Sequence, residues 1–202
     1  MSGAQIEDSG ALLQRGLLLE YATLAWNLIG TVVVVMAAIK ARSVGLAGFG
    51  LDSLIEIFAS VVVVWQLRGA TDRSRERMAM RLISYAFFAL AAYVLAQSAY
   101  TLASGQHPSP SVTGLVWLAA TVIAMLMLAW GKHVTGRRLK NQVLMTEARV
   151  TLVDAYLAAA VLVGVGLNAA AGWWWSDPLS GLVIVYYGIR EAIEARRHVL
   201  EA

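Results

Sequence analysis

Residues 44–65 read Val44-Gly-Leu-Ala-Gly-Phe-Gly-Leu-Asp52-Ser-Leu-Ile-Glu56-Ile-Phe-Ala-Ser-Val-Val-Val-Val-Trp65, an apolar stretch that contains two carboxylates. It is long enough to cross a bilayer as a helix, which takes about 20 apolar residues. Asp52 and Glu56 are about one helical turn apart, so both side chains project from the same face. Two anions on one face of a membrane helix are costly unless a cation comes to them. The pair therefore predicts a cation site inside a membrane protein.

The composition of the whole chain is that of a membrane protein. Of its 202 residues, 59% are hydrophobic and 14% are charged, whereas soluble domains carry about 25% charged residues. There are no cysteines, which excludes disulfides and thiolate metal ligands. The net charge of +3 is mild, and we expect no nucleic-acid partner. The acidic first ten residues lack the basic segment of a signal peptide, so we expect no cleaved leader.

The apolar runs predict an all-α membrane protein with six transmembrane helices. The predicted spans are residues 16–39, 44–67, 78–102, 112–130, 143–171 and 178–193. The predicted breaks are a charged loop at 68–77, a turn with two prolines at 104–110, a basic loop at 131–141 and an aromatic turn at 172–178. In terms of domains, we expect a tail at 1–15, the six-helix domain at 16–193 and a second tail at 194–202.

The distribution of basic residues predicts the orientation. One side of this topology carries twelve Lys and Arg residues, and the other carries only Lys40 and Arg42. The positive-inside rule places the basic side, and with it both chain termini, in the cytoplasm. The run Trp173–Trp175 then falls at the outer membrane surface, and Trp65 and Trp130 fall at the inner one, as in an aromatic belt. The twelve basic residues are Arg15, Arg68, Arg73, Arg75, Arg77, Lys132, Arg137, Arg138, Lys140, Arg190, Arg196 and Arg197.

Polar residues of three different spans fall at one depth. Counting about 1.5 Å per residue from the basic ends places Glu56, Asp154 and Asn27 near the middle of the bilayer, with Asp52 one turn further out. Clustered carboxylates in a low dielectric repel one another, and a divalent cation relieves this repulsion. Oxygen ligands suit ions of the Mg²⁺, Mn²⁺, Fe²⁺, Co²⁺ and Zn²⁺ class. Protons must leave when such an ion binds, so a site open alternately to the two sides exchanges metal for protons.

A second level of polar residues lies nearer the basic ends. Glu20 and Glu147 are about 8–10 Å from those ends by the same count. Glu147, Thr151 and Asp154 follow one another on a single helix face. Two interpretations stay open for Glu20 and Glu147, which either belong to the ion pathway or are acids that snorkel or cap near a helix end.

The remaining polar groups have structural interpretations. Asp177 directly precedes a proline at the start of the last span, which predicts a helix N-cap. His107, His133 and His198 fall in loops or tails, where we expect them to be solvated. Asn27 either serves the ion or bridges two helices.

Two parts of the chain carry motifs typical of one transporter family. The first is Gly48-Phe-Gly-Leu-Asp52-Ser-Leu-Ile-Glu56, preceded by Asn27 and Lys40-Ala-Arg-Ser43, and the second is Thr151-Leu-Val-Asp154 with Gly172-Trp-Trp-Trp-Ser-Asp177-Pro-Leu-Ser-Gly. They resemble the cation diffusion facilitator (cation efflux) family, and the similarity covers essentially the whole chain. The resemblance implies a six-helix transmembrane domain, usually dimeric, that exports a divalent metal in exchange for protons. It also implies a metal site between the second and fifth helices, with Asp52, Glu56 and Asp154 at the family's positions.

The sequence departs from the family pattern in two places. Val150 stands where the family often has a histidine, so Glu147 or Thr151 would supply the missing ligand, and such an all-oxygen site should favour zinc less. The sequence ends soon after the last span, so we expect a short member of the family without the C-terminal cytoplasmic domain. Its homodimer would then form through the transmembrane helices. We expect it in the plasma (inner) membrane of a bacterium.

The sequence therefore predicts a metal/proton antiporter without a prosthetic group. The predicted metal site is Asp52, Glu56, Asp154, Glu147 and Thr151, with Glu20 and Asn27 as accessory or proton-pathway residues. One alternative is a metal-binding relative, or a partner subunit of another transporter, that does not transport. Another is a membrane enzyme that uses the carboxylates as acid and base. We do not expect an enzyme, because the sequence has no cysteine, no phosphate-binding loop and no histidine in the predicted spans.

Overall fold

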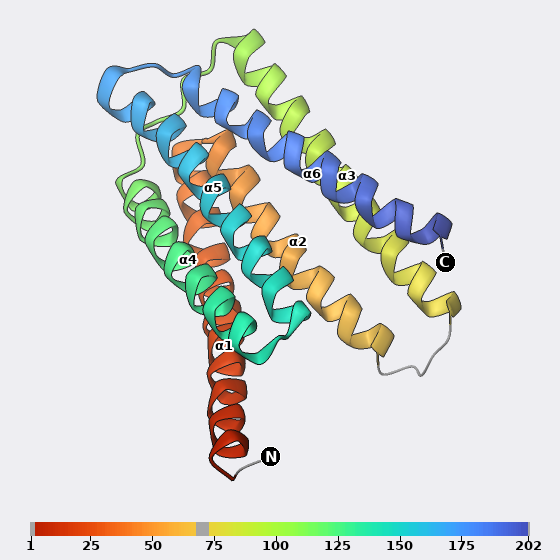
Figure 1. Cartoon of the computed structure of the whole chain (residues 1–202). Coiled ribbons are helices and arrows are strands. Elements are labelled where there is room, and N and C mark those ends of the chain that lie inside the picture. The colour runs from red at the N-terminus through yellow and green to blue at the C-terminus, as the bar shows by residue number, and fades with distance from the viewer. Residues whose placement is uncertain (1–2, 68–72, 202) are drawn as a thin grey trace.

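The computed structural model describes residues 3–67 and 73–201, with side chains described for 11–58, 77–141, 144, 145 and 147–197. Almost all of the described residues belong to six α-helices (Figure 1), which confirms the predicted all-α fold. The helices are α1 (Gly3–Ala41), α2 (Val44–Leu67), α3 (Arg73–Ser104), α4 (Val112–Leu139), α5 (Gln142–Ala171) and α6 (Ser176–Glu201).

The helix bounds follow the apolar runs closely at α2 and α5 and less closely elsewhere. Helix α2 has the predicted bounds, whereas α1 begins within the predicted tail, at Gly3. The predicted basic loop at 131–141 is wrong, since α4 continues to Leu139 and only Lys140 and Asn141 separate it from α5. Lys and Arg are good helix formers and stabilise a helix C-terminus, so charge ended the apolar span but not the helix. Likewise, 73–77 of the predicted charged loop is helical, and 68–72 lies outside the described residues.

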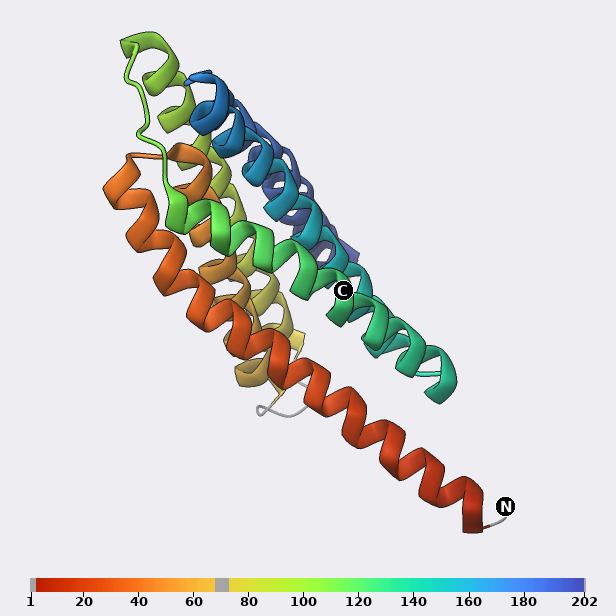
Figure 2. The ribbon, with the colours of Figure 1, turned by 90° about the vertical axis from the view of Figure 1, so that its left-hand side faces the viewer.

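Successive helices run in opposite directions (Figure 1). Both chain termini and the turn between α4 and α5 therefore lie at one end of the bundle, which we call the termini end. The opposite end, called the turn end, carries the turns α1–α2, α3–α4 and α5–α6. Helix α3 packs along α6, and α4 packs along α5 and α1. In Figure 2 the first turns of α1 extend beyond the rest of the bundle at the termini end.

The outer surface of the bundle is apolar, as a lipid environment requires. Leu18, Val32 and Ile123 are between 62% and 69% exposed on this surface. Among the described residues, four stretches are long and apolar enough to cross a membrane, namely Ala11–Ala41, Arg77–Ser104, Val112–Leu139 and Glu147–Ala171. These stretches lie in α1, α3, α4 and α5.

Asp177 fastens the start of α6 to the start of α2 at the turn end. Its side chain is fully buried, and its carboxylate accepts hydrogen bonds from the Ser43 hydroxyl and from the backbone N–H groups of Val44, at 2.9 Å, and Gly45, at 3.1 Å. The predicted cap was assigned to the wrong helix, because Asp177 caps α2 and α6 itself begins one residue earlier. The first N–H groups of α2 have no partner within their own helix, so an acceptor from α6 satisfies them.

Further contacts close the turn end tightly. The Asn168 side chain donates from Nδ2 to the backbone oxygen of Pro108 at 2.9 Å, which ties the end of α5 to the turn before α4. Helices α5 and α6 approach so closely that a Cβ on Gly164 would lie 2.5 Å from the Cβ of Ser180. The turn end is therefore a packed region joined by buried hydrogen bonds.

Candidate cation-binding site

A cavity of about 860 Å³ opens toward the termini end of the bundle. Leu13, Asn141 and Glu194 line it near that end, and Asp52 and Leu157 line it deep inside. Its walls come mainly from α1, α2, α5 and α6. Because the turn end is packed, the cavity approaches the predicted site from one side only within the described part of the chain.

The lining of this cavity is strongly acidic. Seven lining residues are carboxylates and two are arginines, so the cavity favours cations over anions. All seven side chains predicted for the site or its pathway lie on this one surface. They are Glu20, Asn27, Asp52, Glu56, Glu147, Thr151 and Asp154.

The rotation of α2 turns its two carboxylates inward. Leu54 and Phe58, on the opposite face of the helix, are 48% and 41% exposed on the outside of the bundle. Asp52 is only 6% exposed, and both Asp52 and Glu56 line the cavity. The spacing of four residues thus places both acids on the cavity face, as the helical period requires.

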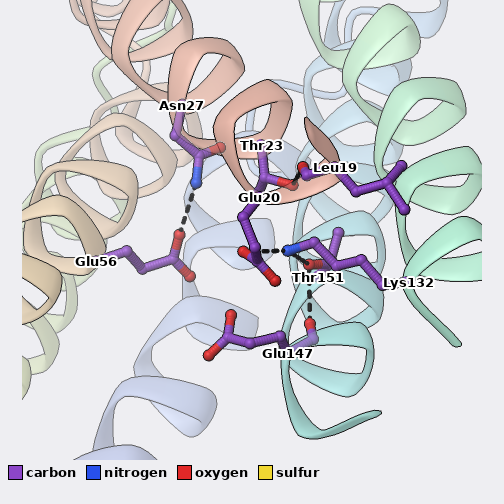
Figure 3. A network of polar contacts seen from close by, with 8 residues as sticks. All are labelled: Leu19, Glu20, Thr23, Asn27, Glu56, Lys132, Glu147 and Thr151. Carbon is purple, nitrogen blue, oxygen red and sulfur yellow. Dashed lines mark hydrogen bonds and ion pairs between the residues drawn. The ribbon is translucent and has the colours of Figure 1, made fainter. Parts of the chain in front are cut away.

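Three helices bring polar groups together at the deep end of the cavity. Asn27 of α1 donates from Nδ2 to Glu56 Oε2 of α2 at 3.2 Å (Figure 3). The carboxyl groups of Glu56 and of Asp154, on α5, lie close enough to interact directly. A hydrogen bond between two carboxyl groups needs one proton, because an ionised carboxylate is only an acceptor. Asp52 lies one turn away toward the turn end, within electrostatic range of Asp154. We call Asp52, Glu56 and Asp154 the deep carboxylates.

Lys132 forms a second polar centre nearer the termini end. Its side chain is fully buried, and its Nζ lies 2.9 Å from Glu20 Oε2 and 3.1 Å from Thr151 Oγ1 (Figure 3). The Thr151 hydroxyl in turn donates to the backbone oxygen of Glu147 at 2.9 Å. Lys132 therefore links α4 to α1 and α5, and its predicted place in a loop is wrong. The signal that could have found it is Glu20, an acid at membrane depth that needs a cationic partner.

Comparison with known proteins identifies the family. Residues 21–200 match the family described as the cation efflux transmembrane domain. The chain belongs to the cation efflux family. This match, with the four apolar helices, makes it a multi-pass integral membrane protein of a cation transporter family.

Two relatives show how far the similarity of this cation efflux protein extends. Transmembrane protein 163 of Xenopus laevis is 22% identical over 187 residues, which cover 88% of this chain and 66% of the relative. The uncharacterized transporter sll1263 of Synechocystis sp. is 25% identical over 150 residues, which cover 69% of this chain and 48% of the relative. The matched part therefore spans about two thirds of the first relative and half of the second.

Val150 is the position at which the resemblance described above implied a histidine. It lines the cavity and is 44% exposed, but it offers no ligand. Of its two predicted substitutes, Thr151 already makes two hydrogen bonds. Glu147 lies near Glu20 and Lys132 and is also within electrostatic range of Glu56 and Asp154. In the described part of the chain, no three His, Asp or Glu side chains are gathered closely enough to hold one metal ion.

Glu191 of α6 is a cavity residue that the sequence reasoning missed. It lines the cavity and lies within electrostatic range of Asp52 and Asp154. Its position at the end of an apolar span, next to Arg190, is typical of a residue at the membrane surface, so nothing in the sequence set it apart.

Proposed function

We propose that this cation efflux protein exchanges a divalent metal ion for protons across a membrane that all six helices span. The metal binds the deep carboxylates Asp52, Glu56 and Asp154 between α2 and α5. These side chains draw together around the ion, because among the described residues no three acidic or histidine side chains are gathered closely enough to hold one. The observation that carries the proposal is their position at the closed end of an acidic cavity that opens to one side. A pathway with an anionic site at its inner end suits a cation that enters and leaves by alternating access.

The closeness of the Glu56 and Asp154 carboxyl groups supports proton exchange. Two carboxylates this close repel each other in a low dielectric, so in the proposal they share a proton while no metal is bound. A divalent ion that takes oxygen ligands from both groups must displace that proton, because metal ligands bind in their deprotonated form. Metal binding and proton release are then coupled in a single step.

The difference between the two ends of the bundle supports alternating access. The cavity opens at the termini end, which the positive-inside rule assigns to the cytoplasm. This arrangement is a cytoplasm-facing state. The opposite state requires α2, α5 and α6 to separate at the turn end, where Asp177 and the close approach at Gly164 now hold them together.

The chemistry of the site limits the cargo and the remaining partners. Its ligands are oxygens, which suit the Mg²⁺, Mn²⁺, Fe²⁺, Co²⁺ and Zn²⁺ class, with zinc favoured less than at a site containing imidazole. We further propose a homodimer formed through the transmembrane helices, in a bacterial plasma membrane. We expect neither a prosthetic group nor enzymatic activity.

The decisive experiment measures flux in proteoliposomes. The purified protein is tested against a panel of divalent metals at several pH values, with an internal metal indicator and an internal pH indicator. We expect metal movement in one direction coupled to proton movement in the other. Asp52→Asn or Asp154→Asn should reduce this flux at least tenfold, because even the loss of a residue that supports a metal ligand lowers metal affinity or activity by about 10–100-fold. Ser53→Ala is the control on α2, because Ser53 is next to Asp52 but does not line the cavity.

Two outcomes separate this proposal from its alternatives. Full flux in both carboxylate variants would show that the metal site is elsewhere. Metal binding without flux in the unmodified protein would favour the non-transporting relative or partner subunit.

A further inference from the structure

Lys132 is a fully buried cation that the transport cycle above does not use. A charged side chain inside a membrane helix is costly and persists where it pairs with another charge. Lys132 does not itself line the cavity, and among the described residues Leu139 is the lining residue of α4. The role of Lys132 must therefore lie in what its ammonium group does to the acids of the neighbouring helices.

The surroundings of the ammonium group resemble those of a bound cation. Its two oxygen neighbours are the Glu20 carboxylate at 2.9 Å and the Thr151 hydroxyl at 3.1 Å (Figure 3). Glu147 and Asp154 also lie within its electrostatic range. Carboxylate and hydroxyl oxygens of this kind are ligands that a hard divalent ion also takes. The lysine occupies oxygens that a metal ion from solution would otherwise reach.

We propose that Lys132 is a tethered counter-ion that neutralises Glu20 at the cavity wall and so restricts divalent metal binding to the deep carboxylates. The inference rests on the proposed function for the identity of the deep site. It adds that the cavity contains a second, latent cation site, which is filled by a cation of the protein itself.

Removal of the ammonium group exposes this latent site. The carboxylates of Glu20 on α1 and Glu147 on α5 then repel each other, with no protein cation to neutralise them. The second oxygen of Glu20, Oε1, is already buried and has no hydrogen-bond partner among the described residues, so it is available to a ligand. With Lys132 neutral, a divalent ion from solution takes the place of the amine.

Removal of Glu20 has the opposite consequence. The amine then loses its nearest carboxylate partner and stays within electrostatic range of Glu147 and Asp154. A positive charge beside the deep carboxylates weakens their attraction for a divalent ion. The two substitutions therefore change metal binding in opposite directions, whereas a purely structural role for Lys132 predicts no additional bound ion.

The test counts Mn²⁺ ions bound to the full-length purified protein in detergent, by equilibrium dialysis and metal analysis. We expect Lys132→Gln to bind one more ion per chain than the unmodified protein, and Lys132→Gln combined with Glu20→Gln to lose that extra ion. Arg138→Gln is the control, because it removes one positive charge from an exposed position of the same helix and should add no ion. An unchanged number of ions in Lys132→Gln would overturn the proposal.

A second arm covers the case in which Lys132→Gln does not fold. Glu20→Gln should bind Mn²⁺ about tenfold more weakly, which is the scale on which groups around a metal site alter its affinity. Unchanged affinity in this variant would also overturn the role of Lys132. Failure of the proposed function is a separate result, since an unmodified protein that binds no ion contradicts the deep site, while the comparison with Lys132→Gln still tests the tethered counter-ion.

Discussion

Thr151 is the residue at which the structural and the ligand interpretations can be separated. Its hydroxyl accepts from Lys132 Nζ and donates to the Glu147 backbone oxygen, and the side chain is 1% exposed. Thr151→Val keeps the shape but leaves the buried amine one acceptor short, which should destabilise the protein by about 1–3 kcal/mol. Thr151→Ser keeps the hydroxyl and is the matched control. The measurement is thermal or denaturant unfolding in detergent.

The same pair of variants tests the predicted ligand role. If Thr151 ligates the metal, Thr151→Val lowers metal affinity while the stability of the metal-free protein stays close to that of Thr151→Ser. Equal stability of the two variants would therefore contradict the assignment of Thr151 as a partner of Lys132.

At the residue scale, the sequence predicted acids better than it predicted their partners. Asp52, Glu56 and Asp154 interrupt apolar runs. Because a charged side chain facing lipid is energetically costly, their inward orientation could be inferred from the sequence. Lys132 follows the apolar run of α4 directly, where a buried amine and a loop amine look the same in sequence. Asp177 could be predicted as a cap, but the helix it caps depends on which two helix starts the fold places side by side.

Gly164 determines how closely α5 and α6 approach at the turn end. A Cβ there would lie 2.5 Å from Ser180 Cβ and 2.6 Å from the backbone oxygen of Ser176, so the two helices would have to move apart. We expect Gly164→Ala to lower the free energy of unfolding by about 1–3 kcal/mol, as overpacking does. Gly166 of the same helix is the control, since its nearest neighbour for a Cβ is Leu115 Cδ2 at 3.8 Å.

The control substitution Gly166→Ala is itself expected to change the stability of the protein. Gly166→Ala adds helix propensity without a clash and should stabilise by about 0.5–1 kcal/mol. The measurement is the free energy of unfolding of both variants in the same detergent. Equal stability of Gly164→Ala and Gly166→Ala would show that the turn end is not closely packed at this position.

At the element scale, the accuracy of the predicted bounds depended on what ends each helix. Helix α2 begins directly after a tight turn at Arg42 and Ser43, and its predicted start at Val44 is correct. Helix α4 carries Arg137 and Arg138 in its last turn and ends at Leu139, and the cap residue Lys140 that follows has a left-handed φ of 52°. Charged residues mark the end of the apolar span, whereas the backbone conformation marks the end of the helix. At α4 the predicted end at residue 130 and the helix end at Leu139 therefore differ by nine residues.

On the scale of the whole molecule, the bundle has one open and one closed end. The sequence could predict that both termini share an end, because six antiparallel spans require it. It could not predict which end is open, because that depends on how closely helices from distant parts of the chain pack. The close contacts at Gly164 and the buried carboxylate of Asp177 lie at one end, and the acidic cavity lies toward the other.

One-sided access can be tested directly, because the sequence contains no cysteine and every introduced thiol is the sole one. Val153 lines the cavity on α5, whereas Val161 lies two turns further along the same helix and is fully buried. In sealed vesicles, a membrane-impermeant thiol reagent should modify Val153→Cys from the side that carries the termini and leave Val161→Cys unmodified. Mn²⁺ should slow the reaction of Val153→Cys, because an ion at Asp154 occupies the space beside it. Modification of Val153→Cys from the opposite side alone, in vesicles of known orientation, would show that the cytoplasm-facing assignment is wrong, whereas additional slow modification from that side is what alternating access predicts.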